Sequence, residues 1–272
     1  MSGLVTLVAE PAGNDELITE RRGAVRWVIF NRPAARNALT WNMYSRLIEV
    51  CEQVNAERDV RAMVLTGAGG KAFVAGTDIS QFRDFKTADD ALAYEARGNL
   101  VMSTLESVRV PTIAAIAGSC TGAGAAIAAC CDIRIATPSA RYGFPIARTL
   151  GNCLSMPNYA RIAALIGMAR LKDVIMRARL MDASEMVACG MLSEVTPDEE
   201  SLPGRAQAMA EEIAAHAPLT LWATKEALRR VRDRLIPEDA DSDLIVACYT
   251  SKDFHEGVES FLAKRKPNWT GE

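Results

Sequence analysis

Short apolar runs that end on turn residues such as glycine and proline recur over the first 195 positions of the chain, and they predict buried strands. Runs of four to eight hydrophobic residues bounded by turn residues are typical of strands that are covered on both faces. We predict strands at residues 25–30, 62–66, 72–75, 112–117 and 132–136.

Hydrophobic residues at helical spacing separate these strands. After Thr40 such residues recur with charged residues on the opposite face, at Tyr44, Leu47, Ile48, Cys51 and Val54. We predict that the polar segment 84–106 forms a helix and that the run of small residues at 125–131 forms another. Residues 1–20 are expected to be a loose lead-in to the first strand.

Beyond Val195 the pattern becomes almost entirely helical. Helices are predicted at residues 202–215, 218–235 and 241–264. These helices are amphipathic and too few to form a hydrophobic core of their own, so they should pack on the core or on another subunit. We therefore expect an α/β core of residues 1–195 and a helical C-terminal arm of residues 196–272.

Composition narrows the range of functions. The chain has 272 residues, 49% of them hydrophobic, and a net charge of −3, which argues against a nucleic-acid partner. No run of about 18 uncharged apolar residues is present to span a membrane. The first twenty residues carry four acidic side chains and no arginine, so no targeting peptide is predicted. A cytoplasmic protein is expected.

Cysteine and histidine offer little material for metal or triad chemistry. The seven cysteines contain no CxxC pair, and the two histidines, His216 and His255, lie far apart. We expect free thiols, no metal site and metal-independent chemistry.

A glycine turn between the strand 112–117 and the helix 125–131 is the strongest candidate for chemistry. The chain breaks on Gly118 and then forms Gly122-Ala123-Gly124. A strand that ends on glycines before a helix leaves backbone N–H groups that can hold a phosphate or an enolate oxygen. A dinucleotide fingerprint is excluded because Ile127 takes the place of its third glycine and no acid follows at the required distance.

Four motifs in order identify a resemblance to one family. They are NRP (31–33) with NAL (37–39), AFxAGxDI (72–79), AxxG (115–118) with GxG (122–124) and CDI (131–133), and FxxKRKP (261–267). On these motifs the chain resembles the crotonase superfamily, the enoyl-CoA hydratase/isomerase family, from about residue 18 to the C-terminus. The resemblance implies a twisted ββα spiral whose helical arm builds a homotrimer, or a hexamer of two trimers.

The same resemblance implies an acyl-CoA site of fatty acid metabolism, with coenzyme A as part of the substrate and no other cofactor. The backbone N–H groups of Thr77 and Ala123 are expected to hold the thioester oxygen as an enolate forms. Residues expected to contact the substrate are Asn37, Ala38, Leu39, Ala75, Gly76, Asp78, Ile79 and Gly122. Phe261 and Lys264 are expected to reach the adenosine 3′-phosphate in a neighbouring subunit, although Lys264 also fits a plain surface charge.

The chain departs from the family's hydratases at both glutamates that activate water and donate the proton. Ala126 occupies the first position, and Ile146 occupies the second, in YGFPI (142–146). A third acid position, used by some isomerases, holds Ser155. No Asp or Glu lies between Asp132 and Asp173, so a shifted alignment restores neither glutamate. Because each such group is worth about 10²–10⁴-fold in rate, we expect a poor hydratase.

Several groups remain as candidates for the chemistry. Asn152, Cys153 and Ser155 are expected in the pocket, and Arg148 is a candidate partner for a carboxylate or a surface arginine. Decarboxylation of a malonyl-type thioester would form the enolate without a base. Asp78 is a further candidate acid, whereas Cys153 lacks an adjacent histidine to make it a nucleophile. One alternative is a protein that binds acyl-CoA without efficient turnover. A scaffold or RNA-associated role is a second alternative, which the acidic net charge disfavours.

Overall fold

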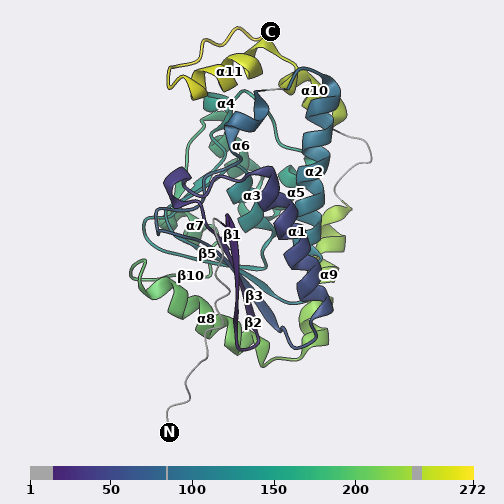
Figure 1. Cartoon of the computed structure of the whole chain (residues 1–272), viewed down its shortest axis with the longest axis vertical. Coiled ribbons are helices and arrows are strands. Elements are labelled where there is room, and N and C mark those ends of the chain that lie inside the picture. Colours follow the sequence, from purple (N-terminus) through teal and green to yellow (C-terminus); the bar gives the residue numbers. More distant parts are fainter. Residues whose placement is uncertain (1–14, 84, 235–240) are drawn as a thin grey trace.

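The computed structural model describes residues 15–83, 85–234 and 241–272. Strands and helices alternate through the first two thirds of this part, and helices follow (Figure 1). The strands are β1 (Leu17–Arg22), β2 (Val25–Phe30), β3 (Ala62–Gly67), β4 (Ala72–Val74), β5 (Thr112–Ile116), β6 (Ser119–Thr121), β7 (Ile133–Ala136), β8 (Arg141–Gly143), β9 (Met181–Asp182) and β10 (Glu194–Val195). The helices are η1 (Pro33–Ala35), α1 (Trp41–Ala56), η2 (Ile79–Phe82), α2 (Ala88–Glu106), α3 (Ala123–Cys130), α4 (Ile146–Thr149), α5 (Met156–Ile166), α6 (Met168–Met176), α7 (Ala183–Ala188), α8 (Ser201–Ala214), α9 (Pro218–Asp233), α10 (Ser242–Tyr249) and α11 (Lys252–Leu262).

Two sheets form the core. The larger has the strand order β1-β2-β3-β5-β7-β10, and all its neighbours are parallel except β1 with β2. The smaller has the order β4-β6-β8-β9. Along the chain a strand of the large sheet is followed by one of the small sheet and then a helix, as in β5–β6–α3. This repeat confirms the predicted α/β class and the ββα spiral.

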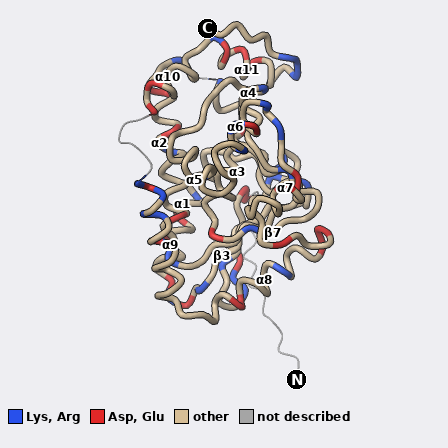
Figure 2. The backbone as a smooth tube through the Cα atoms, turned by 180° about the vertical axis from the view of Figure 1, so that it is seen from behind, with Lys and Arg blue, Asp and Glu red and all other residues tan. Residues whose placement is uncertain are grey.

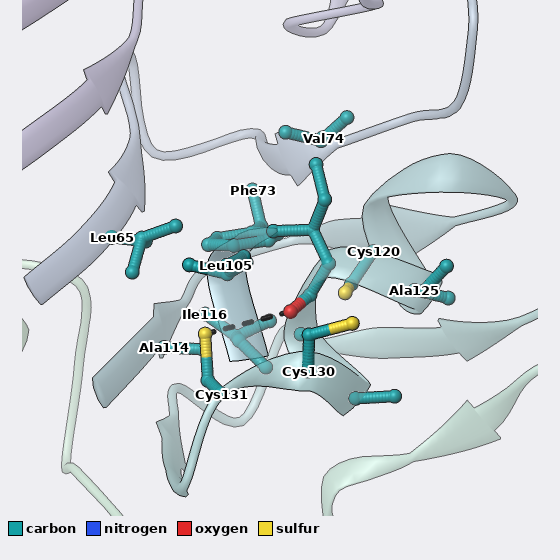
Figure 3. Packing of buried hydrophobic residues seen from close by; sticks show 14 of the residues in the cluster. Leu65, Phe73, Val74, Leu105, Ala114, Ile116, Cys120, Ala125, Cys130 and Cys131 are labelled. Atoms are coloured by element: carbon teal, nitrogen blue, oxygen red, sulfur yellow. Dashed lines mark hydrogen bonds between the residues drawn. The ribbon is translucent and has the colours of Figure 1, made fainter. Parts of the chain in front are cut away.

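Alternation along the strands divides the large sheet into two buried faces. One face carries Val25, Trp27 and Val64 and packs against α8. The other face packs against α1, α2 and α3 and continues into the small sheet. Figure 3 shows Phe73 and Val74 of β4 beside Cys120 and the small residues of α3. Because the side chains of α3 are small, this helix lies directly against β4 and β6.

The C-terminal helices cover the core at two places. Helix α8 lies on the large sheet, whereas α10 and α11 pack against α2 and η2 at the opposite end of the molecule (Figure 1). Tyr249 and Phe254 are buried where these helices meet. The division at residues 195 and 196 stays a prediction, since α8 covers the sheet as a core helix would.

Two sequence expectations are wrong. The lead-in contains strand β1, which pairs antiparallel with β2 from Leu17 opposite Phe30 to Arg22 opposite Val25. The single helix expected at 241–264 is two helices, because Ser251 begins α11 by accepting a hydrogen bond from the Phe254 N–H (3.0 Å). Asp84 and Leu235, the ends of two predicted segments, lie outside the described residues.

Charged residues of both signs are mixed over the outer helices, while α3 carries none (Figure 2). None of the helices within the described ranges has the length and apolar character needed to cross a membrane.

Gly124, in the first turn of α3, has no room for a side chain. An added Cβ would lie 2.1 Å from the Val74 carbonyl oxygen and 2.6 Å from the Val74 Cβ. Since β4 pairs with β6, its backbone cannot retreat freely. We expect Gly124→Ala to lower the free energy of unfolding by about 1–3 kcal/mol in urea denaturation.

Gly204, in α8, is the matched control. A Cβ there would meet nothing within 4 Å. Gly204→Ala should therefore stabilise the protein by about 0.5–1 kcal/mol. Equal stability of Gly124→Ala and the unmodified protein would contradict the close approach of α3 to β4.

Candidate active site

A cavity of about 420 Å³ lies between the two glycine turns, α2 and the C-terminal helices. Its lining is mostly apolar, with a few polar side chains. The lining residues are Ala35, Arg36, Ala38, Tyr44, Ala75, Gly76, Thr77, Asp78, Ile79, Phe82, Tyr94, Glu95, Gly98, Met102, Thr121, Gly122, Ala123, Ala126, Pro145, Ile146, Thr149, Leu150, Asn152, Cys153, Leu154, Asn158, Tyr249 and Phe261.

The two glycine turns meet on one wall of this cavity. Gly76 and Gly122 have φ angles of 115° and 55°, which glycine adopts without strain. A Cβ added at Gly122 would lie 3.4 Å from the Cα of Gly76. The residues that follow the two glycines, Thr77 and Ala123, therefore line the same wall.

Both of these residues present a free backbone N–H. The Leu39 N–H donates to the Gly76 carbonyl (2.9 Å) and the Asp78 N–H donates to the Leu39 carbonyl (2.8 Å), which leaves Thr77 between them. Ala123 is the first residue of α3, where helical N–H groups have no partner. Among the described residues neither N–H donates a hydrogen bond. Two such donors on one wall can hold an oxygen that gains negative charge.

The side chain of Thr77 holds its turn in place. Its hydroxyl lies 2.8 Å from the Tyr44 hydroxyl and 3.1 Å from that of Tyr94. Burial raises the pKa of Tyr44 to about 12 and that of Tyr94 well above its usual value. Both phenols therefore stay neutral and act as hydrogen-bonding groups.

Asp78 lines the cavity, but its carboxylate is already engaged. It accepts from the Ser80 hydroxyl (2.7 Å) and N–H (3.2 Å), and it pairs with Arg32 (3.1 Å). Partial burial works to raise the pKa of Asp78, but these hydrogen bonds outweigh it and leave the pKa lowered. The carboxylate stays ionised and stabilises the turn.

Most of the sequence-predicted contact residues do line the cavity. They are Ala38, Ala75, Gly76, Asp78, Ile79, Gly122, Ala126, Ile146, Asn152, Cys153 and Phe261. Ala126 and Ile146 present only apolar side chains.

Two residues of the NAL motif, Asn37 and Leu39, do not line the cavity. The buried Asn37 amide accepts from the Arg32 N–H (2.9 Å) and donates to the Ala72 carbonyl (2.8 Å), so it ties the η1 turn to β4. Leu39 is buried in the core. These two residues shape the rim of the cavity instead of lining it.

Arg148 and Ser155 are also absent from the wall. Arg148 is exposed, because it follows the buried Ile146 by two helical positions, about 200° around α4. The buried Ser155 hydroxyl donates to Asn99 (2.7 Å) and accepts from Asn158 (3.1 Å), so it joins α2 to α5. The prediction that Ser155 lines the pocket is wrong for this chain's own cavity, whereas the exposure of Arg148 agrees with the alternative of a surface arginine.

Phe261 lines the cavity of its own chain, whereas the resemblance predicted a role in a neighbouring subunit. Lys264 is exposed and does not line the cavity. Arg36, which the sequence did not single out, adds an exposed cation to the rim.

Cys153 is a poor nucleophile. Its thiol donates to the Leu244 carbonyl (3.6 Å), and the neighbouring Cys248 thiol together with burial raises the pKa of Cys153 well above its usual range. No group of three or more His, Cys, Asp or Glu suited to a metal ion occurs in the described ranges.

Glu95, on α2, is a further cavity residue that the sequence analysis did not identify. It is 8% exposed and lines the cavity. The Tyr249 hydroxyl donates to its Oε1 (2.5 Å), and Asn152 Nδ2 donates to the Tyr249 hydroxyl (3.0 Å). Burial raises the pKa of Glu95 from 4.5 to about 7, against the hydrogen bond from Tyr249, which lowers it. The sequence contained one sign that Glu95 is buried: it lies four residues after Ala91, on the apolar face of the helix.

Known proteins share this architecture. The family model for enoyl-CoA hydratase/isomerase matches residues 20–272. The chain is 33% identical to a short-chain-enoyl-CoA hydratase of Clostridium acetobutylicum over 254 residues, which are 93% of this chain and 96% of that protein.

Two solved structures extend the comparison. An enoyl-CoA hydratase/carnithine racemase from Magnetospirillum magneticum superposes with a TM-score of 0.77 at 34% identity, over 96% of this chain and 97% of that one. A methylmalonyl-CoA decarboxylase in complex with 2-nitronate-propionyl-CoA superposes with a TM-score of 0.86 at 25% identity, over 96% and 100%.

The raised pKa of Glu95 predicts a dependence of stability on pH. In the unfolded chain the carboxyl ionises near pH 4.5, whereas in the folded protein it keeps its proton up to about pH 7. The folded state thus binds more protons in this interval, so the stability that Glu95 contributes is lost as the pH rises from 4.5 to 7.

Glu95→Gln should remove this dependence. We expect the variant to gain stability relative to the unmodified protein by up to about 3 kcal/mol across this interval, and the gain to stay constant above it. Urea denaturation at several pH values measures the difference. Parallel curves for the two proteins would show that Glu95 has an ordinary pKa.

Proposed function

Because the chain belongs to the enoyl-CoA hydratase/isomerase family, we propose that it acts on an acyl-CoA thioester through an enolate and hydrates enoyl thioesters poorly. One observation carries the proposal. The free N–H groups of Thr77 and Ala123 share the wall of a cavity whose two hydratase positions hold Ala126 and Ile146.

The backbone donors account for enolate formation. When charge moves from the α-carbon of the acyl group onto the thioester oxygen, two fixed N–H groups stabilise that oxygen without reorganisation. The start of α3 adds a partial positive charge on the same wall. Coenzyme A extends from there along Ala38 toward the rim, where Arg36 and Phe261 lie.

Hydration needs more than these donors. Water must lose a proton as it attacks, and the α-carbon must gain one. The apolar side chains of Ala126 and Ile146 can do neither. The relatives named hydratases support the substrate class, while these two positions argue against efficient water addition in this chain.

Decarboxylation is the second candidate. The structural similarity to a methylmalonyl-CoA decarboxylase favours it, and loss of carbon dioxide generates an enolate without a base. Against it, Arg148 is exposed and cannot bind the carboxylate within the chain's own cavity. A protein that binds acyl-CoA without efficient turnover is the remaining alternative.

The cytoplasmic location and the assembly into a homotrimer or hexamer remain predictions.

Replacement of the Ala123 N–H tests the proposed enolate site. Ala123 is the first residue of α3, a position at which proline is tolerated. Ala123→Pro removes the N–H, so turnover should fall by about 10²–10³-fold while the affinity for a saturated acyl-CoA changes little. Ala123→Gly keeps the N–H and serves as the control. Equal loss in both variants would assign the effect to packing.

Substrate assays test the reaction class. Crotonoyl-CoA hydration, followed by loss of enoyl-thioester absorbance, should turn over below about 0.1 s⁻¹, at least 100-fold below a typical enzyme. Calorimetry should still detect saturable acyl-CoA binding. Turnover above about 10 s⁻¹ would contradict the argument from Ala126 and Ile146. Release of carbon dioxide from methylmalonyl-CoA would favour the second candidate.

A further inference from the structure

We propose that Glu95 is the proton-transfer residue of this cavity, and that Tyr249 and Asn152 are positioning residues for its carboxyl group. The proposal rests on the enolate chemistry proposed above, and it assigns the proton step that Ala126 and Ile146 cannot perform.

Elimination among the ionisable groups of the wall points to Glu95. Asp78 is held ionised by Arg32 and Ser80. The Tyr44 and Tyr94 phenols have raised pKa values, and the Cys153 thiol, whose pKa is also raised, donates to the Leu244 carbonyl. Glu95 is thus the carboxyl of the described wall that is free to change its protonation state.

A comparison within α2 shows that packing does not require this carboxyl. The Glu106 side chain, 9% exposed, pairs with two arginines, Arg161 (2.8 Å) and Arg232 (3.1 Å). Glu95 is also buried, yet among the described residues no lysine or arginine pairs with it. A buried carboxyl without a cation destabilises the fold, and such groups gather at functional sites.

Glu95 lines the same cavity as the proposed enolate donors, Thr77 and Ala123. Glu95, Gly98 and Met102 follow one face of α2 and all line the cavity. Tyr94 contacts the Thr77 hydroxyl (3.1 Å), which joins this part of α2 to the glycine turn. A Cβ at Gly98 would meet nothing within 4 Å, so open space lies beside the carboxyl.

Hydrogen bonds hold one carboxyl oxygen and leave the other available. Tyr249 donates to Oε1, and Asn152 in turn donates to Tyr249. Within the described ranges Glu95 Oε2 accepts no hydrogen bond. Asn152 Oδ1 is buried without a partner, so the wall also holds an acceptor that a bound substrate or water can satisfy.

The proton step is balanced without any other reactant. The Glu95 carboxylate removes a proton from the α-carbon, and the C–H electron pair moves through the carbonyl to the thioester oxygen. The N–H groups of Thr77 and Ala123 stabilise that oxygen. The neutral carboxyl then returns the proton to the same carbon, or to a conjugated one if the acyl chain carries a double bond. The titratable described residues around Glu95 are Tyr44, Tyr94, Cys153, Tyr159, Asp241 and Tyr249.

Deuterium exchange at the α-carbon of butanoyl-CoA, followed by NMR in D₂O, tests this proposal. This saturated thioester can form an enolate but cannot be hydrated or decarboxylated. The unmodified protein should catalyse exchange at a rate that rises with pH through about 7, as Glu95 ionises. Glu95→Gln should lose at least about 100-fold in exchange and keep its affinity for butanoyl-CoA within about threefold.

Three further variants separate chemistry from folding. Glu52→Gln changes an exposed residue of α1 and should exchange like the unmodified protein. Glu95→Asp should restore part of the exchange. Tyr249→Phe removes a donor to the carboxylate, so it should shift the pH profile to higher pH, which a merely structural role would not do.

The outcomes distinguish the two proposals. Full exchange by Glu95→Gln would overturn the role of Glu95 and leave the enolate function intact. Binding without exchange by the unmodified protein would overturn the proton step and favour an acyl-CoA-binding protein. Absence of both binding and exchange would overturn the proposed function itself.

Discussion

The close approach of two backbone turns is the constraint on which the rest of the structure depends. An added Cβ would lie 2.1 Å from a carbonyl oxygen at Gly118 and again at Gly124, so no side chain fits between β4 and the segment from β6 to α3. Only glycine permits this contact. Because the contact is backbone on backbone, Thr77 and Ala123 occupy fixed places on one wall whatever their side chains are, and the rest of the cavity is arranged around them.

The remaining walls come from helices that are distant in sequence, and their chemistry depends on how those helices pack. Helix α10 lies on α2 and brings Tyr249 to Glu95 (Figure 1). The apolar contacts of Phe254 and Ile245 stabilise the packing of α10 that buries Glu95 without a cation. The C-terminal arm therefore does more than cover the core, since it sets the environment of an ionisable group in the cavity.

Features that depend on local sequence pattern could be predicted from the sequence. Features that depend on where a side chain points, or on contacts between distant segments, could not. Glycine turns and buried strands carry short-range signatures, so both turns and the central strands were predicted from the pattern, whereas the ββα spiral was predicted from the family resemblance. Strand β1 was missed because its polar residues form an edge strand that exists only by pairing with β2. A motif also identifies a position in the fold but not the direction of its side chain. For this reason Asn37, Ser155 and Arg148 were predicted to contact the substrate, although their side chains do not line the cavity. Glu95 could be suspected from its place on an apolar stripe, but its neighbour Tyr249 lies 154 positions away.

A cavity with two N–H donors and one free carboxyl favours some reactions over others. Water addition needs a base for the oxygen and an acid for the carbon, which two carboxyl groups perform together. A proton shift needs one group that accepts a proton and then returns it, and such a group works best when its pKa is near the surrounding pH. Burial brings the pKa of Glu95 to about 7, whereas the ion pair of Asp78 holds its carboxyl ionised. The same apolar wall that raises the pKa of Glu95 also strengthens the N–H contacts to an enolate. The apolar side chains of Ala126 and Ile146 and the buried carboxyl of Glu95 thus agree with the proposed chemistry, in which an enolate forms and is reprotonated on a single face of the acyl group.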